Sequence, residues 1–424
     1  MSTKTLIITG AGFSYPAHLP IQSRIIDEML SKPPLGFLGD WDLETFSFYN
    51  AYIHVGIFLL ENYTLVDSNK FKVRINQIID NNKKMTIEHK FIKNISSTKK
   101  FAKEIEKTTH LKTLFNDKSN LEEAVLNNEL IKDMANLKED IRQALVDAKI
   151  TVDLEDLFTK LDKCAKTQSY WKKYSFIKVV EIRQYILQLF IYYFGKKNIA
   201  FTIDKNYESF AEFVKNNRPS VITTNWDTIC EQIFESVGIK YDNCLNCDSY
   251  YKKYTSRVKP QIAKIHGSIN WFTCSNCNSL IIKPKGKETE LLLSDKKVYC
   301  AKCKAKQKKN DILFVPEIIT PTMVKQFTKQ MYINIWQNAQ YLLENANQII
   351  FVGYSMPLAD FEFRFMLTKY ISPHAKISVV LHESDKKEPE EKHEVPEDRY
   401  RCAFPKNDID FYYQGFTDFF DSKV

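Results

Sequence analysis

The chain of 424 residues is long enough for more than one domain, because single hydrophobic cores stop growing at roughly 250–300 residues. Hydrophobic residues make up 44% and charged residues 26%, a composition that excludes an intrinsically disordered protein. The net charge of +8 arises from 60 basic and 52 acidic residues spread over the whole chain. We therefore expect a lysine-rich solvated surface and no direct nucleic-acid binding.

The most apolar stretches do not have the properties of a membrane helix. Residues 56–60 are too few to span a bilayer, and the tract 176–194 contains Lys178 and Arg183. The N-terminal residues lack the pattern of a secretory signal. We expect a cytoplasmic protein without membrane contact, in which the nine cysteines are not paired as disulfides.

The first predicted strand, residues 3–9, runs into a glycine turn. The turn, Gly10-Ala11-Gly12-Phe13-Ser14, precedes a helix predicted over 21–30. Backbone amides in such a turn, together with the N-terminus of a helix, can bind the pyrophosphate of a dinucleotide. Two glycines in a turn are common, and it is their position between a strand and a helix that favours a ligand site.

Between about residues 40 and 210, few segments have a sequence pattern typical of β-strands. Apolar residues recur at helical spacing over 121–149 and again over 176–194. We predict a helical insertion over 40–210, in which the segment 64–120 has no assignable pattern. Such an insertion could cover an active site, build an oligomer interface or simply pack against the rest of the protein.

Three later strands also end abruptly on polar or glycine residues. The strand 221–223 is followed by Thr224-Asn225-Trp226-Asp227, the strand 262–265 by His266-Gly267-Ser268, and the strand 348–352 by Gly353-Tyr354-Ser355. In an open parallel sheet the ligand crevice lies outside the carboxyl ends of the strands. We therefore expect the ends of the strands 3–9, 221–223 and 262–265 to share one crevice, with the side chains of Asn225 and Asp227 on the same side.

Strands and helices alternate over the last 200 residues. Helices are predicted over 228–237, 332–345 and 360–371, and further strands over 311–319, 376–381 and 408–413. This alternation predicts an α/β fold with a doubly wound, Rossmann-like parallel sheet. The sheet domain would comprise residues 1–39 and 211–424, with the helical insertion at 40–210 and a cysteine-containing module at 244–310.

Six of the nine cysteines form CxxC pairs. Cys274, Cys277, Cys300 and Cys303 have the spacing of two zinc knuckles, whose four thiolates complete a tetrahedron around one ion. Because four sulfurs leave no coordination position for water, we expect one structural zinc in a zinc ribbon. Cys244 and Cys247 could form an alternative half-site, belong to a second site or be two ordinary cysteines, and the spacing favours the first four residues as the site.

Four short motifs and the cysteine module occur in the order that sirtuins have. The motifs are GAGFS at 10–14, TTNWD at 223–227, KIHGS at 264–268 and VGYS at 352–355. With these motifs the chain resembles the sirtuin family, and more specifically the bacterial sirtuin-like NAD hydrolases of antiphage defence. The resemblance implies a sirtuin-type sheet that binds NAD as a substrate.

The resemblance also implies roles for single residues. Asn225 would hold the nicotinamide ribose and orient the attacking water, and His266 would act as general base toward a ribose hydroxyl or that water. The residues expected to bind NAD are Gly10, Ala11, Gly12, Ser14, Thr224, Asp227, Gly353 and Ser355. Taken singly, Asn225 could be a turn residue and His266 an ordinary buried histidine, so the prediction depends on the whole set.

The chain departs from the deacylating sirtuins at two places. Those enzymes have Asp-Phe-Arg after the Ile-Pro of the first motif, whereas here Leu19-Pro20 is followed by Ile21-Gln22-Ser23. After the zinc module they have Phe-Gly-Glu, whereas residues 315–322 here read VPEIITPT. The leading interpretation is an NAD glycohydrolase that yields ADP-ribose and nicotinamide. The alternatives are an NAD-dependent protein deacylase and a catalytically idle module that senses NAD or ADP-ribose.

Membership of the defence branch would imply regulation, because an uncontrolled NAD hydrolase would kill its host. We expect a homo-oligomer. A separately encoded HerA-type ATPase or a phage-derived activator is a further candidate partner.

Overall fold

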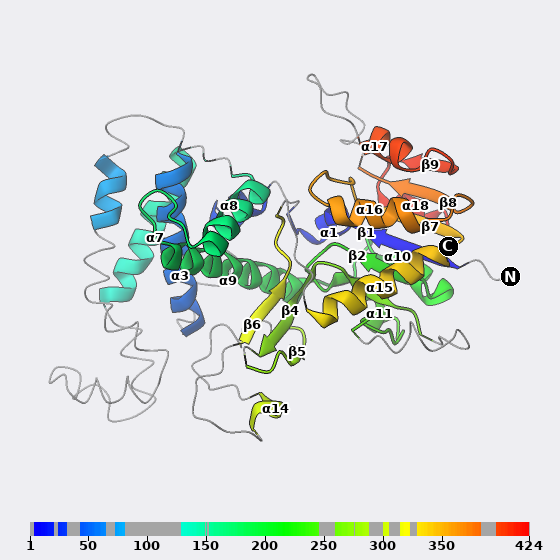
Figure 1. Cartoon of the computed structure of the whole chain (residues 1–424), viewed down its shortest axis with the longest axis horizontal. Coiled ribbons are helices and arrows are strands. Elements are labelled where there is room, and N and C mark those ends of the chain that lie inside the picture. Colours follow the sequence, from blue (N-terminus) through cyan, green and yellow to red (C-terminus); the bar gives the residue numbers. More distant parts are fainter. Residues whose placement is uncertain are drawn as a thin grey trace.

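The computed structural model describes residues 4–20, 24–31, 43–64, 73–80, 129–148, 150, 152–245, 259–274, 276–287, 300–304, 314–322, 329–382 and 396–423. Figure 1 shows three parts: a group of long helices at the left, a parallel sheet with its covering helices at the right, and a small antiparallel sheet below and between them. The segment 64–120, which has no assignable pattern in the sequence, lies outside the described residues except for 64 and 73–80, and Cys247 also lies outside them.

Six parallel strands form the central sheet in the order β3-β2-β1-β7-β8-β9. They are β1 (Thr5–Thr9), β2 (Ser220–Thr223), β3 (Ile262–Lys264), β7 (Gln348–Val352), β8 (Lys376–Val380) and β9 (Ile409–Tyr412). The chain builds outward from β1 to β3 and then returns to place β7 on the other side of β1. This reversal creates a topological switch point between β1 and β7, where open α/β sheets bind ligands. The predicted α/β class with a doubly wound parallel sheet is confirmed.

Both faces of this sheet are covered, because successive side chains of a strand point to opposite sides. Ile7 packs into one buried hydrophobic cluster, whereas its neighbours Leu6 and Ile8 pack into a second. The first cluster contains residues of α10 (Glu208–Asn217), α11 (Ile229–Ser236) and α18 (Phe416–Asp421). The second contains residues of α15 (Gln330–Glu344), α16 (Phe361–Tyr370) and α17 (Pro396–Ala403). Predicted and observed ends of α11, α15 and α16 agree to within two residues.

The connection from β1 to β2 contains the long helices. It begins with α1 (Ala11–Ser14), the 3₁₀ turn η1 (Tyr15–Ala17) and α2 (Ile25–Ser31), and continues with α3 (Leu43–Tyr63), α7 (Glu129–Asp147), α8 (Leu154–Thr167) and α9 (Phe176–Ala200). Asp153 caps α8 by accepting from the Glu155 and Asp156 amides, and Ser175 caps α9. Apolar side chains of these helices belong to the same cluster as one face of the sheet. The division of the chain into domains stays a prediction.

The second sheet is antiparallel, with strand order β5-β4-β6. It consists of β4 (Gly267–Cys274), β5 (Leu280–Ile282) and β6 (Phe314–Ile318), and the short helix α14 (Ala301–Lys304) lies beyond it. The β character predicted over 311–319 therefore belongs to β6 of this small sheet and not to the parallel sheet.

In the part of the chain that the structure describes, no helix combines the length and apolarity needed to cross a bilayer.

The turns after β1 and β7 pack backbone against backbone. The Gly12 amide donates to the Gly353 carbonyl at 2.9 Å, and the Gly10 amide donates to the Val352 carbonyl at 3.1 Å. A Cβ atom on Gly12 would lie 2.7 Å from the Gly353 Cα, and one on Gly353 would lie 2.3 Å from the Phe13 nitrogen. Because no side chain fits between them, glycine is required on both sides of this contact.

Replacing Gly353 should be far more destabilising than replacing a glycine of similar backbone conformation elsewhere. Gly353 has a φ of +61° and Gly238 a φ of +72°, but a Cβ on Gly238 would meet nothing within 4 Å. We expect Gly238→Ala to lose about 1–2 kcal/mol of unfolding free energy from left-handed strain. Gly353→Ala should lose about 1–3 kcal/mol more from overlap with backbone atoms. Urea denaturation measures both, and equal losses would contradict the packing argument.

Candidate functional site

A cavity of about 850 Å³ opens at the switch point of the parallel sheet. This volume lies within the range of about 300–1,000 Å³ that is usual for ligand sites. Nine of the ten residues predicted to bind or act on NAD line it: Ala11, Gly12, Ser14, Thr224, Asn225, Asp227, His266, Gly353 and Ser355. The tenth, Gly10, contacts Asn225 through its carbonyl oxygen, to which the Asn225 amide donates at 2.8 Å. Four separate segments of the chain thus meet around one space.

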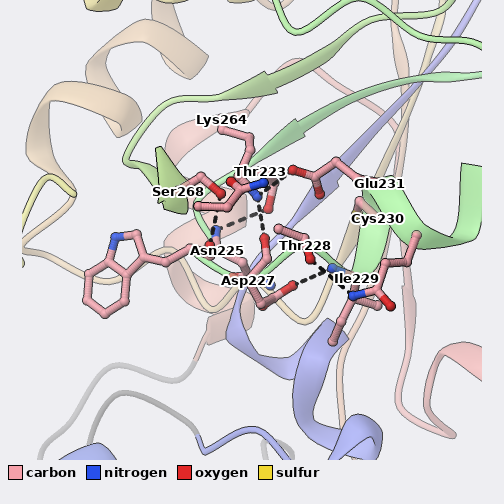
Figure 2. Close-up of polar contacts among 12 residues, drawn as sticks. Thr223, Asn225, Asp227, Thr228, Ile229, Cys230, Glu231, Lys264 and Ser268 are labelled. Atoms are coloured by element: carbon pink, nitrogen blue, oxygen red, sulfur yellow. Dashed lines mark hydrogen bonds and ion pairs between the residues drawn. The ribbon is translucent and has the colours of Figure 1, made fainter. Parts of the chain in front are cut away.

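Asn225 and Asp227 both contact the hydroxyl of Ser14. The Asn225 Nδ2 donates to Ser14 Oγ at 2.9 Å, and Ser14 Oγ donates to Asp227 Oδ2 at 2.7 Å. The other carboxylate oxygen of Asp227 accepts from the Ile229 amide at 3.0 Å at the start of α11, as Figure 2 shows. The two side chains therefore point to the same side, as the sequence predicted.

These contacts determine how the Asn225 carboxamide is oriented. The Gly10 carbonyl can only accept a hydrogen bond, so the amide atom that faces it must be the nitrogen. With both Nδ2 protons directed at Gly10 and Ser14, Oδ1 is the amide atom left for a ligand in the cavity. An amide oxygen presented to the cavity can accept a hydrogen bond from a hydroxyl group or a water molecule.

His266 lies at the junction of β3 and β4 and is buried. Its Nε2 is 3.6 Å from Asp360 Oδ1. At this distance the two side chains form an ion pair when the imidazole is protonated. Asp360 also accepts a hydrogen bond from the Tyr354 hydroxyl at 3.2 Å. Burial and the nearby Asp360 raise the pKa of Tyr354 well above its ordinary value, so this phenol keeps its proton.

The helices of the β1–β2 connection complete the cavity wall. Val152, Asp153, Leu154 and Glu155 at the start of α8 line it, together with Phe194 of α9. Trp226, which stands between Asn225 and Asp227, packs against α9, with its ring centroid 5.9 Å from Phe190 and 6.1 Å from Phe194. The insertion therefore lines the site as well as packing against the sheet, which are two of the three roles considered for it.

Residues 219–399 match the family model described as the SIR2-like domain. The matched segment is less than half of the chain, but it contains Asn225, His266, the cysteine module and Gly353. The match supports a relationship to the sirtuin family. A search of curated proteins gave no match.

Solved structures similar to the chain include several sirtuins. One, from a study of sirtuin substrate affinity, has 12% identity and a TM-score of 0.36, with coverage of 99% of this chain and 92% of that one. Sir2 with a p53 peptide and NAD⁺ has 11% identity and a TM-score of 0.35, with coverage of 99% and 91%. A Sir2 homologue in complex with ADP-ribose has 16% identity and a TM-score of 0.34, with coverage of 58% and 74%. Because these TM-scores are low, the fold assignment rests on the strand order itself.

Several residues at the cavity were not predicted from the sequence. They are Arg24, Asp360, Tyr354 and the start of α8. A signal for Asp360 existed, because it immediately precedes a helix that follows a glycine-ended strand of the parallel sheet. No comparable signal marked the start of α8, since its approach to the cavity depends on how the insertion packs.

The second candidate centre is the cluster of four cysteines. The Sγ atoms of Cys274, Cys277, Cys300 and Cys303 all lie within 4.8 Å of one another, with 3.7 Å between Cys274 and Cys303 and 3.4 Å between Cys277 and Cys300. Four thiolates at about 2.3 Å from a zinc ion would be about 3.8 Å apart, so the cluster fits tetrahedral zinc. The grouping predicted from the spacing is confirmed. Cys244 is buried in the cluster on the α15 face of the sheet, away from these four.

Loss of one of these cysteines should abolish metal binding. We expect the purified parent to contain about one zinc per chain and Cys300→Ser to contain much less, because three thiolates hold the ion weakly. Elemental analysis of the protein measures the metal content. Cys402→Ser is the matched control, since Cys402 is exposed and outside the cluster. A full equivalent of zinc in Cys300→Ser would contradict the assignment.

Proposed function

We propose that the chain is an NAD glycohydrolase that cleaves NAD to ADP-ribose and nicotinamide. The main support is the convergence on one cavity of an oriented carboxamide, Asn225, and a buried imidazole, His266, beside a glycine turn at the switch point of the sheet. The SIR2-like match over residues 219–399 adds to it.

The proposed substrate fits the layout of the strand ends. The glycine contact between the turns after β1 and β7 presents backbone close to the cavity, which suits a pyrophosphate. Thr224, Asn225, His266 and Ser355 also line the cavity. A dinucleotide in this cavity would have its phosphates at Gly10, Ala11, Gly12 and Gly353, with the nicotinamide ribose near Asn225.

The proposed reaction breaks the bond between the ribose C1′ and the pyridinium nitrogen. Nicotinamide departs as a neutral ring with the bonding electron pair, so the leaving group needs no proton. The Asn225 Oδ1 can orient a water molecule toward C1′ and interact favourably with the positive charge that develops there. His266 can accept the proton that this water loses as the new C–O bond forms, and Asp360 can then stabilise the imidazolium.

The choice of hydrolysis over deacylation in this proposal depends on the departure from the Phe-Gly-Glu pattern of deacylating sirtuins. The segment that stands in its place contributes Ile319 and Pro321 to the cavity, and α8 contributes its first turn. The deacylase alternative predicts release of nicotinamide only when an acyl-lysine peptide is added.

Removing either proposed catalytic side chain should lower NAD cleavage sharply. We expect Asn225→Ala to reduce the rate about 10²–10³-fold and His266→Ala about 10²–10⁴-fold. Chromatographic assay of nicotinamide and ADP-ribose, with and without an acyl-lysine peptide, measures the rate. Asn216→Ala and His374→Ala are matched controls, because both residues are exposed and away from the cavity.

Two results would contradict this proposal. One is a variant at Asn225 or His266 as active as the parent. The other is nicotinamide release that depends on the added peptide. Tight binding of NAD without turnover under every condition would instead favour the sensor alternative.

A role in antiphage defence extends the proposal to the cell. In such a role the protein would assemble as a homo-oligomer and stay inactive until a phage-derived activator or an ATPase partner engages it. Depletion of NAD in infected cells that express the parent, but not in cells that express Asn225→Ala, would support this role.

A further inference from the structure

A buried ion pair lies directly beneath the loop that carries Asn225 and Asp227. The Lys264 Nζ is 2.9 Å from Glu231 Oε1, and the two side chains are only 1% and 9% exposed. Lys264 comes from β3, which otherwise presents apolar residues, and Glu231 from the first turn of α11. Neither residue lines the cavity.

Lys264 is also bonded to the loop itself. Its Nζ donates to the backbone carbonyl of Asp227, and Figure 2 shows this contact next to the pair with Glu231. The Asp227 side chain in turn accepts from Ser14, and Ser14 accepts from Asn225. The buried ammonium is therefore linked to the Asn225 amide through the backbone and side chain of Asp227 and the hydroxyl of Ser14.

The pair is poorly explained as a stabilising element of the core. Burial raises the pKa of Glu231, and Lys264 offsets only part of this effect. One carboxylate oxygen, Oε2, is buried without a hydrogen-bond partner among the described residues. Buried ion pairs of this kind add little stability over apolar residues of similar size, whereas removing one partner is costly. A function in fixing geometry accounts better for their presence.

We propose that Lys264 is a positioning residue, held in place by Glu231, that fixes the Thr223–Asp227 loop so that Asn225 keeps its orientation toward the ribose. The inference rests on the proposed NAD hydrolysis, since Asn225 is the residue that it serves. Lys264 acts through the Asp227 carbonyl and touches no substrate.

Two variants separate positioning from stability. Glu231→Gln keeps the Lys264 bond to Asp227 but leaves the ammonium without a counter-charge. The double variant Lys264→Met/Glu231→Leu removes the charges together and replaces them with apolar side chains, but it deprives the Asp227 carbonyl of its donor. Glu231→Gln should therefore lose more thermal stability, whereas the double variant should lose more activity.

The two variants should rank in opposite order in activity and in thermal stability. We expect the double variant to show a kcat about 10- to 100-fold below that of the parent with KM little changed, because small misplacements of a catalytic group have effects of this size. Glu231→Gln should keep kcat within a few-fold while its Tm falls further than that of the double variant. If activity instead follows stability, with the double variant close to the parent in kcat, the proposal is wrong.

A second readout is independent of turnover. Hydrogen exchange followed by mass spectrometry should show faster exchange over residues 223–229 in the double variant than in Glu231→Gln. If the parent does not cleave NAD, the proposed function fails, but the exchange measurement still decides the positioning claim. Unchanged exchange in this segment would overturn it.

Discussion

The architecture of the candidate site depends on one close contact between two turns. The turn after β1 and the turn after β7 meet through Gly12 and Gly353 without any side chain between them. Because β1 and β7 flank the switch point, this contact brings bare backbone to the edge of the sheet. A bulky ligand group can approach such an edge. The side chains that follow β2 and β3 then reach this ligand group from one side. The cavity at this position is a consequence of strand order combined with glycine.

A single hydroxyl then determines the arrangement of the polar side chains. Ser14 follows the glycine turn and has one proton, which it gives to Asp227 while it accepts from Asn225. Reversal of either bond would place two donors or two acceptors face to face, so the network has one arrangement. Groups held in this way need little reorganisation when charge develops on a substrate, which is how electrostatic preorganisation contributes to catalysis. The short first helix thus organises residues that are more than 200 positions away in the sequence.

The sequence predicted the elements whose pattern is local. The strands of the parallel sheet are short apolar runs that stop at glycine or polar residues. The spacing of the cysteines predicts which four of them form a cluster. The pairing of β6 with β4, the approach of α8 to the cavity and the contact of Asp360 with His266 depend on packing between distant segments, which periodicity does not encode. Lys264 lies in an otherwise apolar strand, but its partners on another helix and loop could not be inferred from its position.

The helical insertion is more than a cover, because it touches the loop between the two polar residues that Ser14 joins. Trp226 lies between Asn225 and Asp227 in the chain and packs its ring against Phe190 and Phe194 of α9. Aromatic contacts of this type contribute about 0.5–1.5 kcal/mol each beyond burial. The apolar face of α9 is continuous with the cluster beneath the sheet, so a displacement of α9 would have to move Trp226 or open that cluster. The packing of Trp226 thus fixes the position of the Asn225–Asp227 loop relative to α9.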